Sequence, residues 1–201
     1  MVAECQTNDY VLEGQNILIR EIRMGDMDGF HKMVTKSGFY YYCFDGSREA
    51  VESFVGEAVA AQKVEKGALR KSFMMAVVDK GDQNLVGHVT LDILDKAPDY
   101  FDLAYFTDPD CQGRGVATEA SGLLLRHVFN QNNLDKVVAT VHPNNFPSQK
   151  VLRKLGFVET GDVTSVASTN GDNIRLCYEL TRKNFSIAER GMPWGPQLLV
   201  A

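Results

Sequence analysis

Hydrophobic residues in the first half of the chain recur with two periods, and each period predicts one type of element. A two-residue repeat predicts strands at 16–22, 73–78, 85–93 and 100–107. A three- to four-residue repeat after a helix-start residue predicts helices at 27–36 and from 48 to about 66. Since short connections join the last three strands, we expect them to be antiparallel neighbours.

In the second half of the chain, predicted helices alternate with predicted strands. A long helix begins within 113–118, and its apolar residues recur along one face at Ala117, Ala120, Leu124 and Val128. A β-rich run at 137–141 predicts a strand buried on both sides. Pro147 is tolerated only in the first turn of a helix, and Gly156 ends that helix. Two final strands are predicted at 157–160 and 174–180.

These elements predict a mixed α+β fold, in which an antiparallel half joins a parallel crossover half in a sheet of six to seven strands. No internal repeat or Pro/Ser-rich linker divides the chain. We therefore expect one domain over 16–184, an N-terminal extension over 1–15 and a C-terminal tail over 185–201. The apolar end of this tail, around Trp194, is typical of a buried contact and suggests a homodimer.

The composition is that of an ordinary globular chain. Of its 201 residues, 44% are hydrophobic and 23% are charged, which excludes a mainly disordered chain, a collagen and a coiled coil. The net charge of −5 offers no basic surface to a phosphate backbone, so we expect no nucleic-acid partner. No run of ~18 apolar residues is present and the N-terminus is polar, so we predict neither a membrane-spanning helix nor a secretory signal.

The cysteines and histidines argue against a metal site. The four cysteines (Cys5, Cys43, Cys111 and Cys177) contain no Cys-x-x-Cys pair, and the histidines show no His-x-x-x-His spacing. Scattered cysteines in a chain of this length are typical of reduced thiols. We therefore expect a cytoplasmic protein without a bound metal.

The segment 112–118 lies between a predicted strand and the long helix, and reads Gln-Gly-Arg-Gly-Val-Ala-Thr. Gly113 and Gly115 allow a tight loop with converging backbone N–H groups, and the helix adds unpaired N–H groups and the positive end of its dipole. This arrangement suits a pyrophosphate, although a Gly-x-Gly loop before a helix is also common as a plain turn. It is neither a Walker loop nor a full dinucleotide fingerprint, since Thr118 stands where a third glycine is expected.

A second segment, 144–157, makes the pattern more specific. The two segments together resemble the signatures of the GNAT superfamily of acetyl-CoA-dependent N-acetyltransferases, and within it most resemble the RimJ/RimL branch. These signatures are Gln/Arg-x-x-Gly-x-Gly/Ala, and Asn-x-x-Ser followed by Leu-Gly-Phe. The matching residues are Gln112, Gly115 and Ala117, then Asn145, Ser148, Leu155, Gly156 and Phe157. The resemblance covers about 16–184.

The resemblance implies a GNAT fold, in which the strands 100–107 and 137–141 splay apart at the centre of a sheet with helices on both faces. The family places the pantetheine arm of acetyl-CoA in this opening, bonded to the backbone of the first strand like an added half-strand. The matching positions are Leu103, Tyr105, Phe106 and Thr107 for the pantetheine, Gln112, Gly113, Arg114, Gly115, Val116, Ala117 and Thr118 for the pyrophosphate, and Asn145 and Ser148 for the pantetheine or its sulfur.

Acetyl transfer to an amine requires a base, because an ammonium has no lone pair and a free alkylamine has a pKa of ~10.4. We favour Asp102, since many members of the superfamily carry a glutamate at the matching position. The alternative is an ordinary exposed carboxylate at a strand end. Asp92 and His88, on the polar face of the neighbouring predicted strand, are alternative bases. A histidine titrates near neutrality, but on a strand face it is more often packed or solvated.

The departing thiolate benefits from a proton donor. Many relatives place a tyrosine four residues before the Gly-Phe pair, where this chain has Leu152, which cannot donate a proton. Ser148 is the candidate instead, as in the RimL-like branch, although it could equally be a first-turn residue that bonds its own helix backbone. The predicted catalytic residues are thus Asp102, Ser148 and His88.

The sequence therefore predicts an acetyl-CoA-dependent enzyme that moves an acetyl group to a primary amine by direct transfer. The acceptor is either a protein N-terminus or a small amine. It is set by residues 39–48 and by the loop between the last two strands, neither of which carries a readable pattern. An alternative from another class is a non-catalytic acyl-CoA-binding module with a regulatory or structural role.

Overall fold

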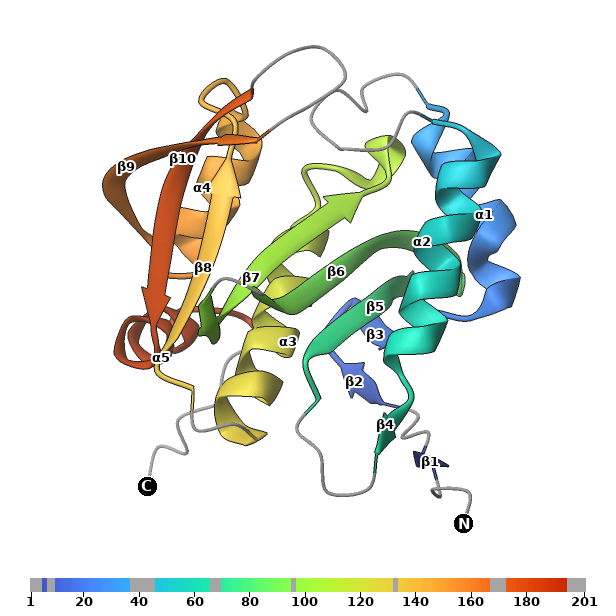
Figure 1. Ribbon diagram of the computed structural model, residues 1–201, viewed down its shortest axis with the longest axis horizontal. Helices are drawn as coiled ribbons and strands as arrows, with labels where there is room; N and C mark the ends of the chain where they lie inside the picture. The colour runs from blue at the N-terminus through green and yellow to red at the C-terminus, as the bar shows by residue number, and fades with distance from the viewer. Residues whose placement is uncertain are drawn as a thin grey trace.

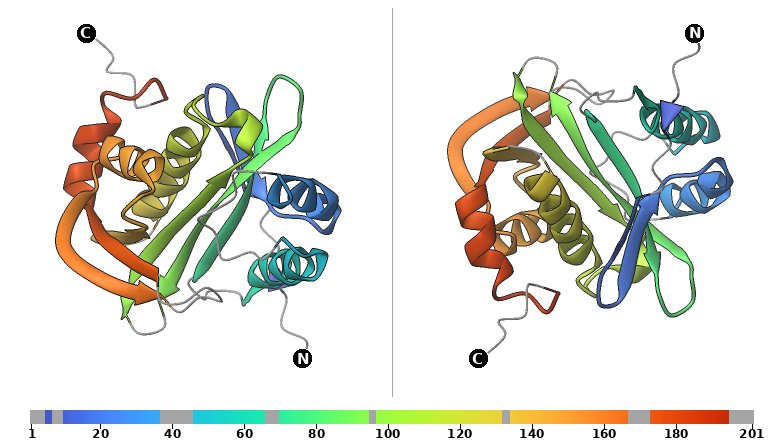
Figure 2. Two further views of the ribbon diagram at one scale, coloured as in Figure 1. Left: turned by 90° about the horizontal axis from the view of Figure 1, so that it is seen from above. Right: turned by 90° about the horizontal axis from the view of Figure 1, so that it is seen from below.

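The computed structural model describes residues 5–6, 10–36, 46–65, 70–94, 97–131, 134–166 and 173–194. Within them the chain forms one eight-stranded sheet with helices packed on both faces (Figures 1 and 2). A short pair of strands, β1 (Cys5–Gln6) with β4 (Val64–Glu65), stands apart from this sheet. The predicted fold class, a mixed fold with a mostly antiparallel sheet, is confirmed.

The strands of the sheet follow the order β2-β3-β5-β6-β7-β8-β10-β9, and only β7 and β8 run parallel to each other. Their bounds are β2 Val11–Glu13, β3 Ile17–Glu21, β5 Ser72–Asp79, β6 Leu85–Leu94, β7 Ala97–Thr107, β8 Lys136–Val141, β9 Val158–Val166 and β10 Asn173–Thr181. The sheet has one strand more than the predicted upper count of seven. The additional strand is β2, whose three residues are too few to show a two-residue repeat.

The described residues form five α-helices and two short 3-10 helices. They are α1 Met27–Val34, α2 Arg48–Ala61, α3 Val116–Gln131, α4 Phe146–Lys154, α5 Arg182–Glu189, η1 Met24–Asp26 and η2 Pro109–Cys111. Side chains cap the helix starts: Ser47 accepts the Ala50 N–H at α2, and Thr181 accepts the Asn184 N–H at α5. Helices α1 and α2 lie on one face of the sheet, and α3 and α4 lie on the other (Figure 2).

The alternation of side chains along the strands produces two hydrophobic cores. The larger core lies between the sheet and α3 with α4, and the smaller lies between the sheet and α1 with α2. In β5, Met75 and Val77 belong to the larger core and Ala76 to the smaller. In β7, Leu103 belongs to the larger core and Phe106 to the smaller. The central strands are therefore buried on both faces, which fixes the direction in which each side chain points.

The two central strands separate within the sheet, as predicted. β7 and β8 pair only at Phe101 with Val137 and at Asp102 with Val138. Beyond these pairs, β7 continues to Thr107 beside β6 and β8 continues to Val141 beside β10, so the two strands diverge (Figure 1). The facing edges of both strands carry backbone N–H and C=O groups outside any strand pairing. This opening lies between an antiparallel half-sheet and a crossover half-sheet.

The predicted tail packs against its own chain at Trp194. The Arg126 guanidinium donates to the Trp194 carbonyl at 2.6 Å and lies 5.3 Å from the centre of the indole ring. A Cβ atom built on Gly122 of α3 would lie 1.9 Å from this ring, so glycine is needed there for close approach. Trp194 therefore contacts α3 within one chain, and the homodimer stays a prediction.

Two absences hold within the described residues. No described helix has both the length and the apolar character that crossing a membrane requires. Nowhere in these ranges do three or more His, Cys, Asp or Glu side chains lie close enough together to hold a metal ion.

Candidate active site

The loop before α3 has the geometry of an anion site. Gly113 and Gly115 have φ angles of 78° and 84°, in the left-handed region that favours glycine, and both are exposed. The first backbone bond of the helix runs from the Glu119 N–H to the Gly115 carbonyl at 2.9 Å. The N–H groups of residues 116–118 therefore have no partner within the helix. These N–H groups and the helix dipole favour an anion beside the exposed glycines.

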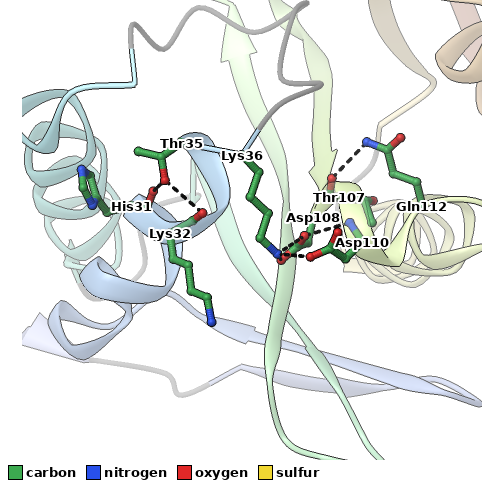
Figure 3. Close-up of polar contacts among 8 residues, drawn as sticks. All are labelled: His31, Lys32, Thr35, Lys36, Thr107, Asp108, Asp110 and Gln112. Atoms are coloured by element: carbon green, nitrogen blue, oxygen red, sulfur yellow. Dashed lines mark hydrogen bonds and ion pairs between the residues drawn. The ribbon is translucent and has the colours of Figure 1, made fainter.

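Ion pairs tie the start of this loop to the end of α1. Lys36 Nζ lies 2.7 Å from Asp108 Oδ1 and 2.6 Å from Asp110 Oδ2, and Asp108 also accepts the Asp110 N–H at 3.0 Å (Figure 3). Hydrogen bonding to Lys36 lowers the pKa of Asp110, so this pair is ionised at neutral pH. Gln112 Nε2 lies 3.4 Å from the Thr107 carbonyl. The loop is thus connected to α1 and to the end of β7, and Lys36 is a contributor that the sequence pattern did not indicate.

Glu119, in the first turn of α3, connects that helix to the sheet. It is 6% exposed and accepts the Asn16 N–H at 3.0 Å, at the turn between β2 and β3. A Cβ atom on Gly14 would lie 2.2 Å from Glu119 Oε1, so the turn packs directly on this carboxylate. Glu119 therefore holds the helix that carries the anion site against the edge of the sheet.

Helix α4 begins beside β7 and brings two predicted residues together. Asn145 caps the helix by accepting the Ser148 N–H at 3.2 Å. The hydroxyl of Tyr105, on β7, lies 2.9 Å from Ser148 Oγ and 3.0 Å from the Ser148 carbonyl. Burial raises the pKa of Tyr105, so this hydroxyl stays protonated at neutral pH. Tyr105 was predicted to contact the cofactor, but its hydroxyl contact with Ser148 was not predicted.

Asp102 stands where β7 and β8 begin to separate, on the face covered by α1 and α2. It belongs to the last pair between these strands, and across β6 it lies opposite Asp92. Asp102 Oδ1 is buried and has no hydrogen-bond partner. Burial, and then the charge of Asp92, raise the pKa of Asp102 to about 6. Asp92 accepts a hydrogen bond from Ser72, and burial raises its pKa as well.

His88 lies on the same face of the sheet as Asp102, but it is four residues along β6 from Asp92, the residue opposite Asp102. It is 3% exposed, and the rings of Phe30, Phe54 and Phe106 lie with their centres 5.0 to 6.1 Å from its own. Burial lowers the pKa of His88 to about 3, so the imidazole is neutral. The geometry makes this histidine a member of an aromatic cluster in the smaller core.

The other predicted cofactor contacts lie along β7 and at the start of α3. Leu103 and Phe106 are buried in opposite cores, so their backbone groups are what they offer to a ligand. Thr107 is 9% exposed, and its Oγ1 is buried without a hydrogen-bond partner. At the loop itself, Arg114 is exposed while Val116 and Thr118 are buried. Residues 39–45 and the loop 167–172, predicted to set the acceptor, lie outside the described residues.

Leu152 of α4 occupies the position where many GNAT proteins carry a tyrosine. It is 1% exposed and belongs to the larger core. A side chain that packs there is surrounded by apolar residues. Among the described residues, two tyrosine hydroxyls reach α4 from strands: that of Tyr105 on β7 contacts Ser148, and that of Tyr178 on β10 accepts a hydrogen bond from Arg153.

Comparisons with known proteins agree with this geometry. Residues 16–158 match the model of the acetyltransferase (GNAT) domain. The uncharacterized N-acetyltransferase YnaD of Bacillus subtilis (strain 168) is 26% identical over 149 residues, covering 73% of this chain and 82% of that protein.

Solved structures show the same fold. The ribosomal-protein-S5-alanine acetyltransferase from Vibrio fischeri has a TM-score of 0.72 at 20% identity, covering 94% of this chain and 100% of that chain. RimJ from Mycobacterium smegmatis, solved with CoA-disulfide, has a TM-score of 0.70 at 22% identity, covering 87% of each chain. Because the domain match spans most of the sequence and the splayed sheet agrees with it, the chain belongs to the GNAT family, whose members are acyltransferases that use acetyl-CoA to acetylate an amine.

Proposed function

We propose that this chain transfers the acetyl group directly from acetyl-CoA to a primary amine, with no acetylated enzyme intermediate. The observation that carries the proposal is the position of Asp102, a partly buried carboxylate with a pKa of about 6 at the start of the opening between β7 and β8. An acetyl-cysteine route is disfavoured, because burial raises the pKa of the Cys111 thiol and so reduces its thiolate fraction.

Acetyl-CoA would bind along the opening. Its pyrophosphate would accept hydrogen bonds from the backbone N–H groups of the loop that contains Gly113 and Gly115. Its pantetheine would extend along the β7 edge from Leu103 to Thr107, which β8 does not pair. The buried Thr107 hydroxyl would gain a partner there, which removes the cost of leaving it unpaired. The thioester then lies between Asp102 and Ser148.

Asp102 would act as the base. At pH 7 a carboxyl group with a pKa of about 6 is mostly ionised, yet it is more basic than an ordinary aspartate. The amine nitrogen bonds to the thioester carbon and passes one proton to Asp102. The C–S bond then breaks, and its electron pair leaves with the sulfur. His88 is a poor alternative because its pKa of about 3 makes it a weak base.

Ser148 would stabilise the departing thiolate, and Tyr105 would orient Ser148. A carbonyl oxygen only accepts hydrogen bonds, so two arrangements are open to this pair. When Tyr105 donates to the Ser148 carbonyl, Ser148 Oγ donates to Tyr105; when Tyr105 donates to Ser148 Oγ, the serine proton is available to the sulfur. The second arrangement places a hydrogen-bond donor on the thiolate without forming a charged tyrosine.

The acceptor remains one of the two predicted types, a protein N-terminus or a small amine. The Vibrio fischeri neighbour is named for acetylation of an alanine of ribosomal protein S5, which is a precedent for the first type. Asp92 and Asp102 place two carboxylates on the face under α1 and α2. A cationic amine of either type is compatible with this charge.

Thiol release from acetyl-CoA in the presence of added amines tests the proposal. Wild-type protein should release CoA only when a primary amine is present, and Asp102→Asn should reduce turnover at least 100-fold while its affinity for CoA stays within twofold. The matched control is Asp82→Asn in the exposed turn between β5 and β6, which should behave as wild type.

The binding-module alternative gives a different result. A non-catalytic module would bind CoA in calorimetry and release no thiol with any amine of a broad panel. Equal turnover by wild type and Asp102→Asn would instead remove Asp102 from the reaction and leave the family activity in place.

A further inference from the structure

Three residue pairs across β6 and β7 face α1 and α2. In order along the strands they are His88 with Phe106, Thr90 with Ala104, and Asp92 with Asp102. The first pair is aromatic and buried against α1 and α2, and the last is acidic. Because alternate residues of a strand share a face, the middle pair lies between them, with one hydroxyl beside the small side chain of Ala104.

The middle and last pairs each contain a buried polar atom without a hydrogen-bond partner. Thr90 is only 6% exposed, and its Oγ1 has no hydrogen-bond partner. Asp102 Oδ1 is also buried and also lacks a hydrogen-bond partner. The register makes Thr90 and Asp102 diagonal neighbours, whose Cα atoms are ~7–8 Å apart in antiparallel pairs. A single nitrogen that makes hydrogen bonds of ~2.9 Å to each side chain can lie between such neighbours. Buried polar groups are normally satisfied, so this pair of atoms points to a partner supplied by a ligand.

The charge on this face favours a cationic ligand. Neither Asp92 nor Asp102 forms an ion pair with a lysine or arginine within the described part of the chain, and Asp92 is held by a hydrogen bond from Ser72. The buried Arg70 is paired with Glu21 at 2.5 Å instead. The carboxylates of Asp92 and Asp102 therefore lie together on this face of the sheet, and no lysine or arginine of the described residues forms an ion pair with either.

We propose that Thr90 binds the amine of the acceptor, and that Thr90, Asp92 and Asp102 form an ammonium site that selects primary amines. The inference rests on the proposed direct transfer. A primary ammonium gives one proton to Asp102 and keeps two N–H groups, one of which bonds Thr90 Oγ1. The lone pair that is freed forms the N–C bond to the thioester carbon, and the electron pair of the C–S bond leaves on the sulfur. One of the two remaining N–H protons then passes to this sulfur, so that the products are the amide and the CoA thiol. Asp92 supplies the second negative charge that attracts the cation.

Thr90→Val tests this site, because valine keeps the shape of threonine and lacks its hydroxyl. The acceptor probes are an alanyl peptide with a free N-terminus and a linear diamine, and the probe with the greater wild-type thiol release is used for all variants. Thr90→Val should raise the KM for this amine about fivefold to tenfold, the effect expected of one lost hydrogen bond, and leave the KM for acetyl-CoA unchanged.

The melting temperature of Thr90→Val should equal or exceed that of wild type, because a buried unpaired hydroxyl has been removed. Thr90→Ser, which keeps the hydroxyl, should retain the wild-type KM.

The other outcomes separate this inference from the proposed function. An unchanged amine KM in Thr90→Val, while Asp102→Asn lacks turnover, rejects the role of Thr90 and keeps direct transfer. A fall in kcat with an unchanged amine KM also rejects it, because the hydroxyl would then serve the thioester oxygen. A lower melting temperature with an unchanged amine KM identifies a purely structural threonine. If Thr90→Val does not fold, Thr90→Cys, whose thiol is a weak hydrogen-bond acceptor, should show the same rise in amine KM, and a wild-type KM in that variant rejects the site.

Discussion

Asp102, the proposed base, lowers the stability of the folded protein when its carboxyl group is ionised. Folding raises the pKa of its carboxyl group from 3.8 to about 6, so the ionised form destabilises the folded state at neutral pH. At pH 8 the free energy of unfolding of Asp102→Asn should therefore exceed that of wild type by up to ~3 kcal/mol. The variant should accordingly unfold at a higher temperature. The difference should shrink as pH falls through 6 and disappear only at about pH 3, below the unfolded pKa of 3.8, where the wild-type carboxyl is protonated in both states. Thermal unfolding of the two proteins across this pH range measures the effect, and a destabilised Asp102→Asn at pH 8 would contradict it.

Asp92 adjusts the basicity of its neighbour. Its negative charge is the second cause, after burial, of the raised pKa of Asp102. Asp92→Asn should therefore move the acid limb of the pH profile of kcat/KM to lower pH, by less than the full interval between 3.8 and 6 because burial remains. Asp92→Glu keeps the charge and should retain the wild-type limb. An unchanged limb in Asp92→Asn would show that another group controls the profile.

Gly115 combines a backbone requirement with an electrostatic one. Its φ of 84° disfavours any side chain, although a Cβ atom would meet nothing within 4 Å. Gly115→Ala should weaken CoA binding a few fold through backbone strain alone. Gly115→Glu adds a carboxylate beside the proposed pyrophosphate site. It should therefore weaken CoA binding at least tenfold more than Gly115→Ala does, and the difference between the two variants should narrow at high salt. Calorimetry with CoA measures both, and equal affinities would reject this loop as the pyrophosphate site.

At this scale the sequence predicts which residues are chemical candidates better than what they contact. The position of Asp102 at the opening was expected from the family resemblance, which implies an opening beside this strand and a glutamate at the matching position. The burial of His88 among three phenylalanine rings does not, because those rings come from α1, α2 and β7. One feature of the sequence indicates that the Tyr105 hydroxyl has a partner: Tyr105 is a polar residue on a strand face that otherwise carries Phe101 and Leu103. Its partner on α4 depends on how the helix packs.

At the scale of elements, the ion pairs of Lys36 connect α1 to η2, just before the anion site (Figure 3). Lys36→Met should weaken CoA binding several fold, because the charges of Asp108 and Asp110 would then be uncompensated beside the proposed pyrophosphate site. Lys32→Met is the matched control: Lys32 is exposed on α1, just before Lys36, and its substitution removes the same charge, but neither carboxylate is its hydrogen-bond partner. Equal losses in both variants would attribute the effect to net charge rather than to these ion pairs.

Most predicted elements are present in the structure where a repeat is long enough to be read, but their ends are less accurate. The helix predicted from 48 to about 66 ends at Ala61, because Val64 and Glu65 pair with β1 as the short strand β4. The strand and helix around the anion loop were predicted from the alternation at 100–107 and the helical stripe of α3, and the observed helix begins at Val116. The strand β9 extends to Val166, beyond the predicted end at 160, because its residues are exposed on the edge of the sheet and show no alternation. Burial, rather than propensity, is what makes a strand visible in a sequence.

At the scale of the whole molecule, Trp194 fastens the end of the described chain to α3. Gly122→Ala should displace the indole ring, because the added Cβ would lie 1.9 Å from it. In wild-type background this change should lower the melting temperature and increase proteolysis after Glu189. In the Trp194→Ala background the same change should instead stabilise, by about 0.5–1 kcal/mol, since alanine is the better helix former. Thermal unfolding in both backgrounds measures whether the effect of Gly122→Ala on stability changes sign. The same sign in both backgrounds would exclude the contact between Gly122 and Trp194.

The overall architecture was predictable because two kinds of information agreed. The hydrophobic periods indicated an antiparallel half and a crossover half, and the family signatures placed the opening between them, which the register of β7 and β8 confirms. The acceptor could not be predicted in the same way. Its determinants were expected in loops, where no periodicity constrains the side chains, and binding residues on loops are set by the partner rather than by packing.

The opening between β7 and β8 also has a consequence for handling the protein. An unpaired strand edge is normally confined to the rim of a sheet, where charges, prolines and bulges discourage association with other chains. Here two such edges face each other in the interior of the sheet, and the cofactor is their proposed occupant. Preparations stripped of nucleotide should therefore precipitate more readily than those supplemented with CoA, because a foreign peptide segment can hydrogen-bond where the pantetheine would otherwise lie.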